Sequence, residues 1–143
     1  MEDEAKQWII IRTDLDMPVG KIASQAAHAA MKAAILDYAE WKNTCVSQGS
    51  MTKPSTTLTL TFEDDSALGL WLKGIFTKVC LAAKSEEQLM EKYETAEAHG
   101  LQTCLIEDVG RTCFDGVKTI TACAVGPAMV SEVRFLRDLP LLK

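Results

Sequence analysis

The feature that most constrains this chain is a short apolar run followed, after a brief turn, by a long alanine-rich stretch. Residues 8–11 are one tryptophan and three isoleucines, a run typical of a strand buried on both faces. Pro18 ends the turn and suits the first position of a helix, where its missing N–H costs nothing. No helix-breaking residue follows Gly20 until Gly49. We therefore expect a strand over about 8–13 and a helix over about 18–43.

Two stripes of side chains run along this predicted helix. The first is apolar and small enough to pack closely on a sheet, and it consists of Ile22, Ala26, Ala29 and Ala33. The second is polar and consists of Lys21, Gln25, His28 and Lys32. Lys21 lies beside the free N–H groups of the helix start, which predicts an anion site. The alternative is the solvated polar face of an ordinary amphipathic helix.

The rest of the chain alternates between strand and helix patterns. The expected elements are a loop at 44–56, a half-buried edge strand at 57–62, a short helix capped near Ser66 and ended by Gly74, a strand at 76–81, a helix at 85–99 with a Ser85 capping box, strands at 101–106 and 119–125, and a short helix at 128–136. Asp115-Gly116 predicts a hairpin that pairs Thr112 with Thr119. This order predicts one domain over 1–143, a three-layer α/β/α fold around a four-stranded mixed sheet, with residues 57–62 as a candidate extra edge strand.

Composition limits the class of protein and its partners. The 143 residues are 48% apolar and 24% charged, an ordinary globular mixture, and no apolar run approaches the roughly 20 residues that span a bilayer. Five widely spaced cysteines without a CxxC pair predict reduced thiols, a cytoplasmic location and no metal site. The net charge of −5 argues against broad nucleic-acid binding but leaves room for a local basic patch.

A candidate site arises where two distant segments are expected to meet. Asp108 follows a strand that should run parallel to the first strand, so Asp108 and Lys21 are predicted at the same sheet edge. Lys21, Gln25 and His28 would then face Asp108, Arg111, Thr112 and Thr119. Taken singly, Asp108 and Gly110 are ordinary turn residues, and Arg111 is an ordinary surface charge.

The residue types in this predicted site favour hydrolysis without a covalent intermediate. Asp108 or His28 would position or deprotonate water, and Lys21 or a backbone N–H would stabilise the oxyanion. Ser24, four residues before His28, is a candidate nucleophile, although no acid is evident to orient the histidine. The sequence contains no GxSxG elbow, P-loop or GxGxxG motif.

Two blocks of the sequence resemble the type 2 peptidyl-tRNA hydrolases. The first runs from Ile11 to Met17 and on through Gly20–Gln25 to His28-Ala29, and the second comprises Asp108–Thr112, Thr119 and Gly126-Pro127. Val109, Ser24 and Ala26 depart from the usual residues without removing a reactive group. Residues 47–70 resemble an insertion.

The resemblance implies a homodimeric esterase that cleaves the bond between a peptide and the 3′-terminal ribose of tRNA, without metal or cofactor. On this basis the expected catalytic residues are Lys21, His28, Asp108 and Thr112, and the expected substrate-binding residues are Gly20, Gln25, Arg111 and Thr119. The alternatives are a non-catalytic module that binds a tRNA end or a phosphorylated ligand, and a dimeric interaction protein on the same fold.

Overall fold

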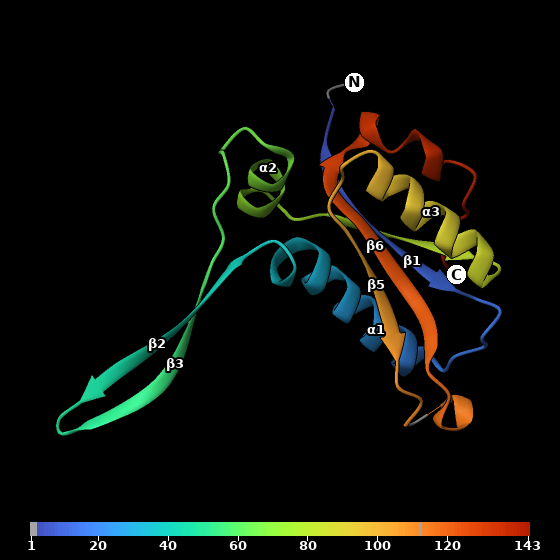
Figure 1. The fold of residues 1–143 in the computed structure, drawn as a ribbon. Coiled ribbons are helices and arrows are strands. Elements are labelled where there is room, and N and C mark those ends of the chain that lie inside the picture. Colours follow the sequence, from blue (N-terminus) through green and yellow to red (C-terminus); the bar gives the residue numbers. More distant parts are fainter. Residues whose placement is uncertain (1–2, 112) are drawn as a thin grey trace.

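A computed structural model describes residues 3–111 and 113–143 (Figure 1). Its strands and helices, in chain order, are β1 Ala5–Arg12, α1 Val19–Met31, a π-helical turn η1 Lys32–Leu36, β2 Glu40–Gln48, β3 Met51–Thr59, α2 Ala67–Lys73, β4 Lys78–Ala83, α3 Glu86–Ala98, β5 Thr103–Asp108, a 3₁₀ turn η2 Phe114–Gly116, β6 Thr119–Met129, and the 3₁₀ turns η3 Val130–Glu132 and η4 Arg134–Leu136.

The central sheet has four strands in the order β4-β1-β6-β5. β4 pairs with β1 in parallel, whereas β6 is antiparallel to both of its neighbours, β1 and β5. The predicted mixed sheet is therefore confirmed. Because β6 reverses direction between them, β1 and β5 point the same way, and their carboxyl ends lie at the same edge of the sheet.

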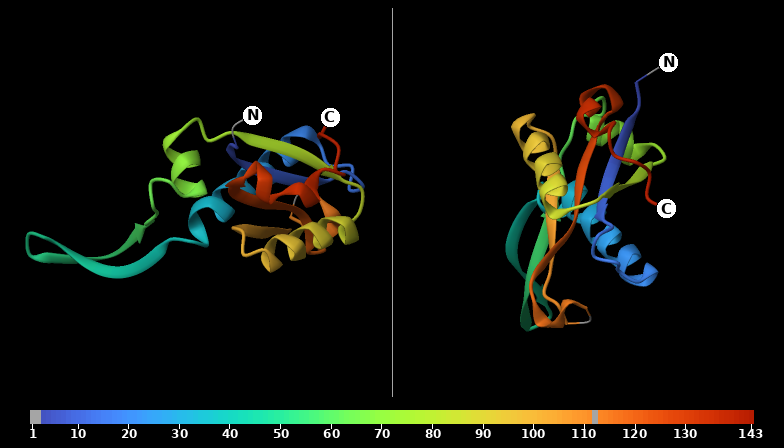
Figure 2. Two further views of the ribbon diagram at one scale, coloured as in Figure 1. Left: turned by 90° about the horizontal axis from the view of Figure 1, so that it is seen from above. Right: turned by 90° about the vertical axis from the view of Figure 1, so that its right-hand side faces the viewer.

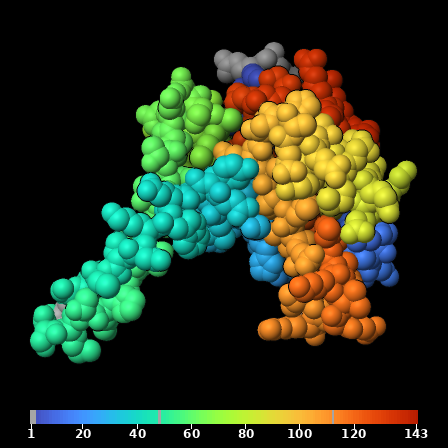
Figure 3. All heavy atoms as spheres, in the orientation of Figure 1, coloured from blue at the N-terminus to red at the C-terminus, as the bar shows by residue number. Residues whose placement is uncertain are grey.

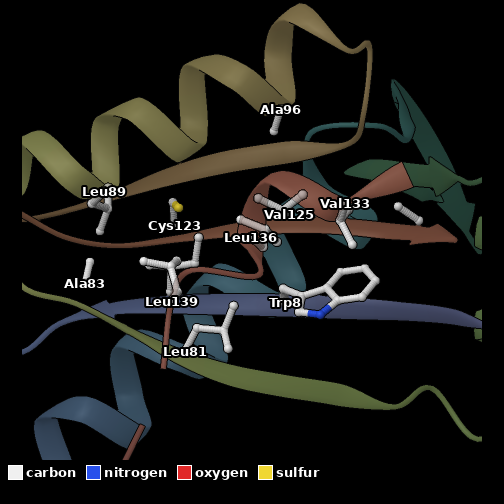
Figure 4. Packing of buried hydrophobic residues seen from close by; sticks show 12 residues of the cluster. Trp8, Leu81, Ala83, Leu89, Ala96, Cys123, Val125, Val133, Leu136 and Leu139 are labelled. Carbon is white, nitrogen blue, oxygen red and sulfur yellow. The ribbon is translucent and has the colours of Figure 1, made fainter. Parts of the chain in front are cut away.

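Helices cover both faces of this sheet, which confirms the predicted three layers. Alternate residues of β1 point to opposite faces. Trp8 and Ile10 belong to the apolar core under α3, whereas Ile9 and Ile11 belong to the core under α1. Figure 4 shows Leu89 of α3 and Trp8 within the first core, and the two views of Figure 2 show the layers from other sides. Burial on both sides explains why β1 has an unbroken apolar run.

The first helix begins as predicted but ends earlier. α1 starts at Val19, directly after Pro18, and the helical path stops at Leu36 instead of reaching residue 43. The stop depends on a distant segment. Gln102 Nε2 donates to the carbonyl oxygens of Ala33 at 3.0 Å and Ala34 at 3.5 Å. Carbonyls near a helix end lack donors within the helix, so the Gln102 side chain supplies a donor that the local sequence does not reveal.

Residues 40–59 form a β-hairpin, which corrects two predictions. The expected loop at 44–56 and the expected edge strand at 57–62 are replaced by β2 and β3, which make a separate two-stranded sheet. The strands join through Gly49-Ser50, and Gly49 has a φ of +64° that suits a two-residue turn. Figures 1 and 3 show the hairpin extending away from the sheet and its helices. Its strand faces lie exposed, so there was no core-facing alternation to indicate it.

Two predicted helix caps are confirmed, whereas the predicted C-terminal helix is not. Ser85 Oγ accepts a hydrogen bond from Gln88 N at 3.1 Å, and Ser66 Oγ accepts one from Gly69 N at 3.1 Å. The predicted helix at 128–136 is wrong, because β6 continues to Met129 and the chain then makes only the 3₁₀ turns η3 and η4. Pairing of Ala5 and Lys6 with Met129 and Ala128 keeps this segment extended.

Thiol labelling is expected to separate the five free cysteines by burial. Burial raises the pKa of the Cys104 thiol to about 11 and also raises the pKa of the Cys123 thiol. Cys45 is exposed on the hairpin. Because the thiolate is the reactive form, Cys45 should react with a thiol reagent at pH 8 within minutes, while Cys104 and Cys123 should react only after unfolding. Mass spectrometry of labelled peptides measures this, and rapid native labelling of Cys123 would contradict the packing described here.

Candidate active site

Lys21 and Asp108 meet at the edge of the sheet, as the sequence predicted. Lys21 comes from the first turn of α1, and Asp108 is the last residue of β5. Lys21 Nζ lies 3.0 Å from Asp108 Oδ1, and the two side chains are only 15% and 13% exposed. An ion pair shielded to this degree interacts more strongly than one in bulk water. The structure thus joins two groups of opposite charge that lie far apart in sequence.

The second carboxylate oxygen of Asp108, Oδ2, is buried and has no hydrogen-bond partner within residues 3–111 and 113–143. A buried polar atom without a hydrogen bond costs free energy and is uncommon in folded proteins. This oxygen is therefore a free acceptor held next to the Lys21 ammonium.

The predicted Asp115-Gly116 turn forms, because both residues have positive φ and Val117 N donates to the carbonyl of Phe114 at 2.9 Å. The strands expected on either side of this turn are not seen in the described residues, so the predicted hairpin register is wrong. Asp108 pairs directly with Thr119 in the antiparallel register of β5 and β6, so Thr119 lies beside Asp108. The residues of the predicted Asp115-Gly116 turn belong to η2, and Thr119 Oγ1 donates to the carbonyl of Val117 at 3.0 Å. Thr112, the other member of the predicted threonine pair, lies outside the described residues.

Gly110 shapes this turn. Its φ is +83°, and a Cβ atom placed there would come within 2.7 Å of Val117 N. Gly116 N also donates to the carbonyl of Gly110 at 3.0 Å, which closes the turn. Arg111, one residue on, is exposed. Only glycine permits this backbone conformation and this close approach, so the turn that follows Asp108 depends on residue 110.

Gln25 is buried, although the helical pattern placed it on a polar face. Its side chain is 2% exposed, and the Thr121 hydroxyl donates to Gln25 Oε1. Sequence reasoning missed Thr121. It lies two residues after Thr119 in β6, so strand alternation puts both threonines on one face, and this spacing was available as a signal. The structure therefore makes Gln25 a link between α1 and the sheet below Lys21.

His28 and Gly20 lie at the surface of the same helix. His28 is exposed, and its Nε2 is 3.3 Å from Ser24 Oγ. His28 follows Lys21 by seven residues, which is about two turns or roughly 10 Å along the helix axis. No acid is seen to hydrogen-bond His28 in the described part of the chain, so nothing there orients it as the base for Ser24. Gly20 is exposed, with open space where a Cβ would stand.

Arg12, the last residue of β1, is already hydrogen-bonded to other groups of the protein. It forms two hydrogen bonds to the Asp14 carboxylate, and its Nη1 donates to the carbonyl of Ile120 at 2.9 Å. These bonds lower the pKa of Asp14 and raise the pKa of Arg12. The sequence offers Arg12, Lys21, Arg111 and Lys118 as candidates for a local basic patch. Of these, Arg12 is neutralised by Asp14, whereas Arg111 and Lys118 are exposed.

Across residues 3–111 and 113–143, no group of three or more His, Cys, Asp or Glu side chains is arranged to hold a metal ion. In the same residues, no helix is both long and apolar enough to cross a membrane.

Comparison with known proteins identifies the family. A family model described as peptidyl-tRNA hydrolase PTH2 matches residues 5–142. The chain belongs to this family. It is also similar to archaeal proteins named peptidyl-tRNA hydrolase. The Sulfolobus acidocaldarius protein is 32% identical over 143 residues, covering 96% of this chain and 99% of that protein. The Halobacterium salinarum protein is 35% identical over 137 residues, covering 95% and 98%, and the Methanopyrus kandleri protein is 31% identical over 139 residues, covering 96% and 98%.

The match confirms the resemblance seen in the two sequence blocks, and with it the expected enzyme class. The peptidyl-tRNA hydrolase model includes both blocks, because it spans the chain from β1 to the C-terminal tail. Neither non-catalytic alternative has comparable support. In this family member the geometry adds a chemical detail, which is a shielded lysine–aspartate pair with one free carboxylate oxygen.

Proposed function

We propose that this chain hydrolyses the ester between a peptide and the 3′-terminal ribose of tRNA at the site formed by Lys21 and Asp108. The observation that carries this assignment is the 3.0 Å contact between Lys21 Nζ and Asp108 Oδ1, combined with the unpartnered Asp108 Oδ2. A buried acceptor beside a cation has no structural benefit on its own, whereas ester hydrolysis needs both a water-orienting acceptor and a positive charge.

The two groups divide the reaction between them. Asp108 Oδ2 accepts a hydrogen bond from water and takes its proton as the water oxygen attacks the ester carbonyl carbon. The negative charge that develops on the carbonyl oxygen is stabilised by the Lys21 ammonium. The bond between this carbon and the ribose oxygen then breaks, and the proton passes to the leaving oxygen. Because Asp108 Oδ2 is covered in this structure, substrate binding must displace the groups around it by enough to admit water.

Of the other predicted site residues, four are assigned to the substrate, and Gln25 is assigned to positioning Lys21. Arg111 and His28 are exposed, so a phosphate or ribose of the tRNA end can reach them. Gly20 leaves open space at the start of α1, and Thr119 lies beside Asp108. Gln25 holds α1 against Thr121, so its contribution is to position Lys21. The catalytic role of Thr112 remains a prediction.

The expected homodimer and the cytoplasmic location also belong to this proposal. The homodimer follows from the family resemblance. The cytoplasmic location follows from the cysteines, which are free in the structure, and peptidyl-tRNA is a substrate that this location provides. Sedimentation of the purified chain at several concentrations measures its state of association, and a monomer at all concentrations would remove the dimer from the proposal.

The test of function is turnover of an N-acetylated aminoacyl-tRNA by the wild-type chain, and the same assay distinguishes the two candidate bases. Asp108→Asn should lower kcat by roughly 10²-fold or more, since it removes the proton acceptor next to Lys21. His28→Ala should mainly raise KM, because His28 lies about two helical turns from Lys21 and contacts Ser24. The reverse result, a loss of kcat in His28→Ala alone, would make His28 the base. Binding of tRNA by the wild type without any turnover would support the non-catalytic module instead.

A further inference from the structure

We propose that the hairpin of β2 and β3 is an RNA-binding arm that contacts the body of the tRNA while its 3′ end occupies the site at Lys21 and Asp108. This inference rests on the proposed function, because it assumes that the bound RNA is the substrate. It adds a second contact surface with a distinct role, which is to recognise the RNA and not the ester.

The hairpin is built as a free-standing ribbon. Each strand has nine residues, or about 30 Å of extended chain, and in the described structure the two strands pair only with each other. Trp41 is 57% exposed at its root, and Met51 is 63% exposed near its tip. A two-stranded hairpin without further packing is only marginally stable, so a partner that covers one face would stabilise it. Figure 3 shows it projecting as an arm from the rest of the molecule.

The charge of the arm is opposite to that of the rest of the chain. The chain carries 20 acidic residues and a net charge of −5, yet residues 41–62 contain no aspartate or glutamate. Lys42 and Lys53 are the charged residues of this stretch, and Glu40 at the root is the one acid in β2 and β3. A lysine-bearing surface that is poor in acids attracts anionic partners, and both a phosphate backbone and the acidic surface of a second copy are anionic. The phosphate backbone carries a charge on every nucleotide and is the more densely charged of the two, which favours RNA.

The strand register places both lysines on one face. Lys53 pairs with Val46, which lies four residues after Lys42 on β2, and residues at even spacing share a face. The lysines are therefore roughly 13 Å apart along the ribbon. Thr44 and its partner Ser55 lie between them on this same face. Lysine ammonium groups and hydroxyls are groups that commonly contact nucleic-acid phosphates, so this lysine face can follow a phosphate backbone.

The distance between the arm and the site fits a large substrate. The helical path from Lys21 to Leu36 separates this lysine from the hairpin root by roughly 22 Å. A ligand that touches both must extend over at least this length, which folded tRNA does and the peptide ester alone does not. Figure 1 and the right-hand view of Figure 2 both show the hairpin tip and the segment after β5 directed toward the same end of the molecule. One extended RNA can therefore approach both from that end.

The test compares two substrates and two charge-reversed variants. The variant Lys42→Glu/Lys53→Glu reverses the lysine face, and Arg134→Glu/Arg137→Glu makes the same change in net charge at exposed residues beyond the opposite edge of the sheet. The substrates are a full-length N-acetylated aminoacyl-tRNA and the N-acetylated aminoacyl ester of its 3′-terminal trinucleotide. Thermal unfolding of both variants verifies that each remains folded.

The arm variant should lose roughly tenfold in kcat/KM on the full-length substrate through a higher KM, with unchanged turnover of the trinucleotide ester. The slope of log Kd against log salt for deacylated tRNA should become shallower by about one to two, the contribution of two lost phosphate contacts. The arginine variant should match the wild type in both measurements.

Equal loss on both substrates, or no loss on either, would overturn the RNA-binding arm. So would a change in sedimentation mass of the arm variant, which would make the hairpin a contact between copies of the chain. If the wild type hydrolyses neither substrate, the proposed function fails, and the salt-dependent binding of deacylated tRNA still decides the role of the arm.

Discussion

Lys21→Ala is expected to lower kcat for N-acetylated aminoacyl-tRNA by roughly 10²–10³-fold, the usual loss when one group that stabilises an oxyanion is removed. The reason is the position of the ammonium group, 3.0 Å from Asp108 Oδ1 in a site where both side chains are largely shielded from water. In the proposed mechanism the charge that Lys21 stabilises develops only in the transition state, so kcat should fall more than KM rises. Initial rates of peptide or amino-acid release measure this directly.

Lys32→Ala provides the matched control for this substitution. Lys32 lies on the same helical path and also forms an ion pair, with Asp37 at 2.8 Å, but its side chain is 41% exposed and far from Asp108. It should leave kcat within a factor of two of the wild type. The double variant Lys21→Ala/Asp108→Asn should lose less than the product of the two single losses, because the two groups act together. Turnover by Lys21→Ala within threefold of the wild type would exclude Lys21 from catalysis.

Gly110→Ala should destabilise the turn after Asp108 and reduce activity, whereas Gly116→Ala should have a much smaller effect. Both glycines have positive φ, so each substitution costs on the order of 1 kcal/mol in backbone strain. Only at Gly110 would the new Cβ also meet backbone, at 2.7 Å from Val117 N and 2.8 Å from Val117 O. Since these atoms cannot move aside as a flexible side chain would, the total cost at Gly110 should exceed about 3 kcal/mol.

Two measurements separate the consequences of this substitution. Urea unfolding gives the loss of stability, and kcat reports whether the turn still holds Asp108 against Lys21. The difference between the two alanine variants isolates the close backbone approach from the shared strain of positive φ. Equal values for Gly110→Ala and Gly116→Ala in both measurements would show that the turn near Asp108 tolerates a side chain at either position.

The local sequence was sufficient for the parts of the fold that depend on short-range patterns. The apolar run of β1 reflects burial on both faces, and Ser85 and Ser66 cap their helices through contacts three residues away. The meeting of Lys21 and Asp108 could also be predicted, because strands that point the same way end at one edge of a sheet. Each of these inferences needs only residue spacing and the direction of a strand.

The tertiary structure decided what depends on contacts between distant residues. The helical path of α1 and η1 ends beside Gln102, whose side chain donates to the carbonyls of Ala33 and Ala34, contacts across 69 and 68 residues that no local pattern encodes. Gln25 is buried against β6, where the Thr121 hydroxyl donates a hydrogen bond to Gln25 Oε1. Helical periodicity alone placed Gln25 on a solvated face. The hairpin escaped prediction for the opposite reason. Its strands pack on no core, so before Thr57 they lack the alternation that burial imposes, and only the folded chain shows that they pair with each other.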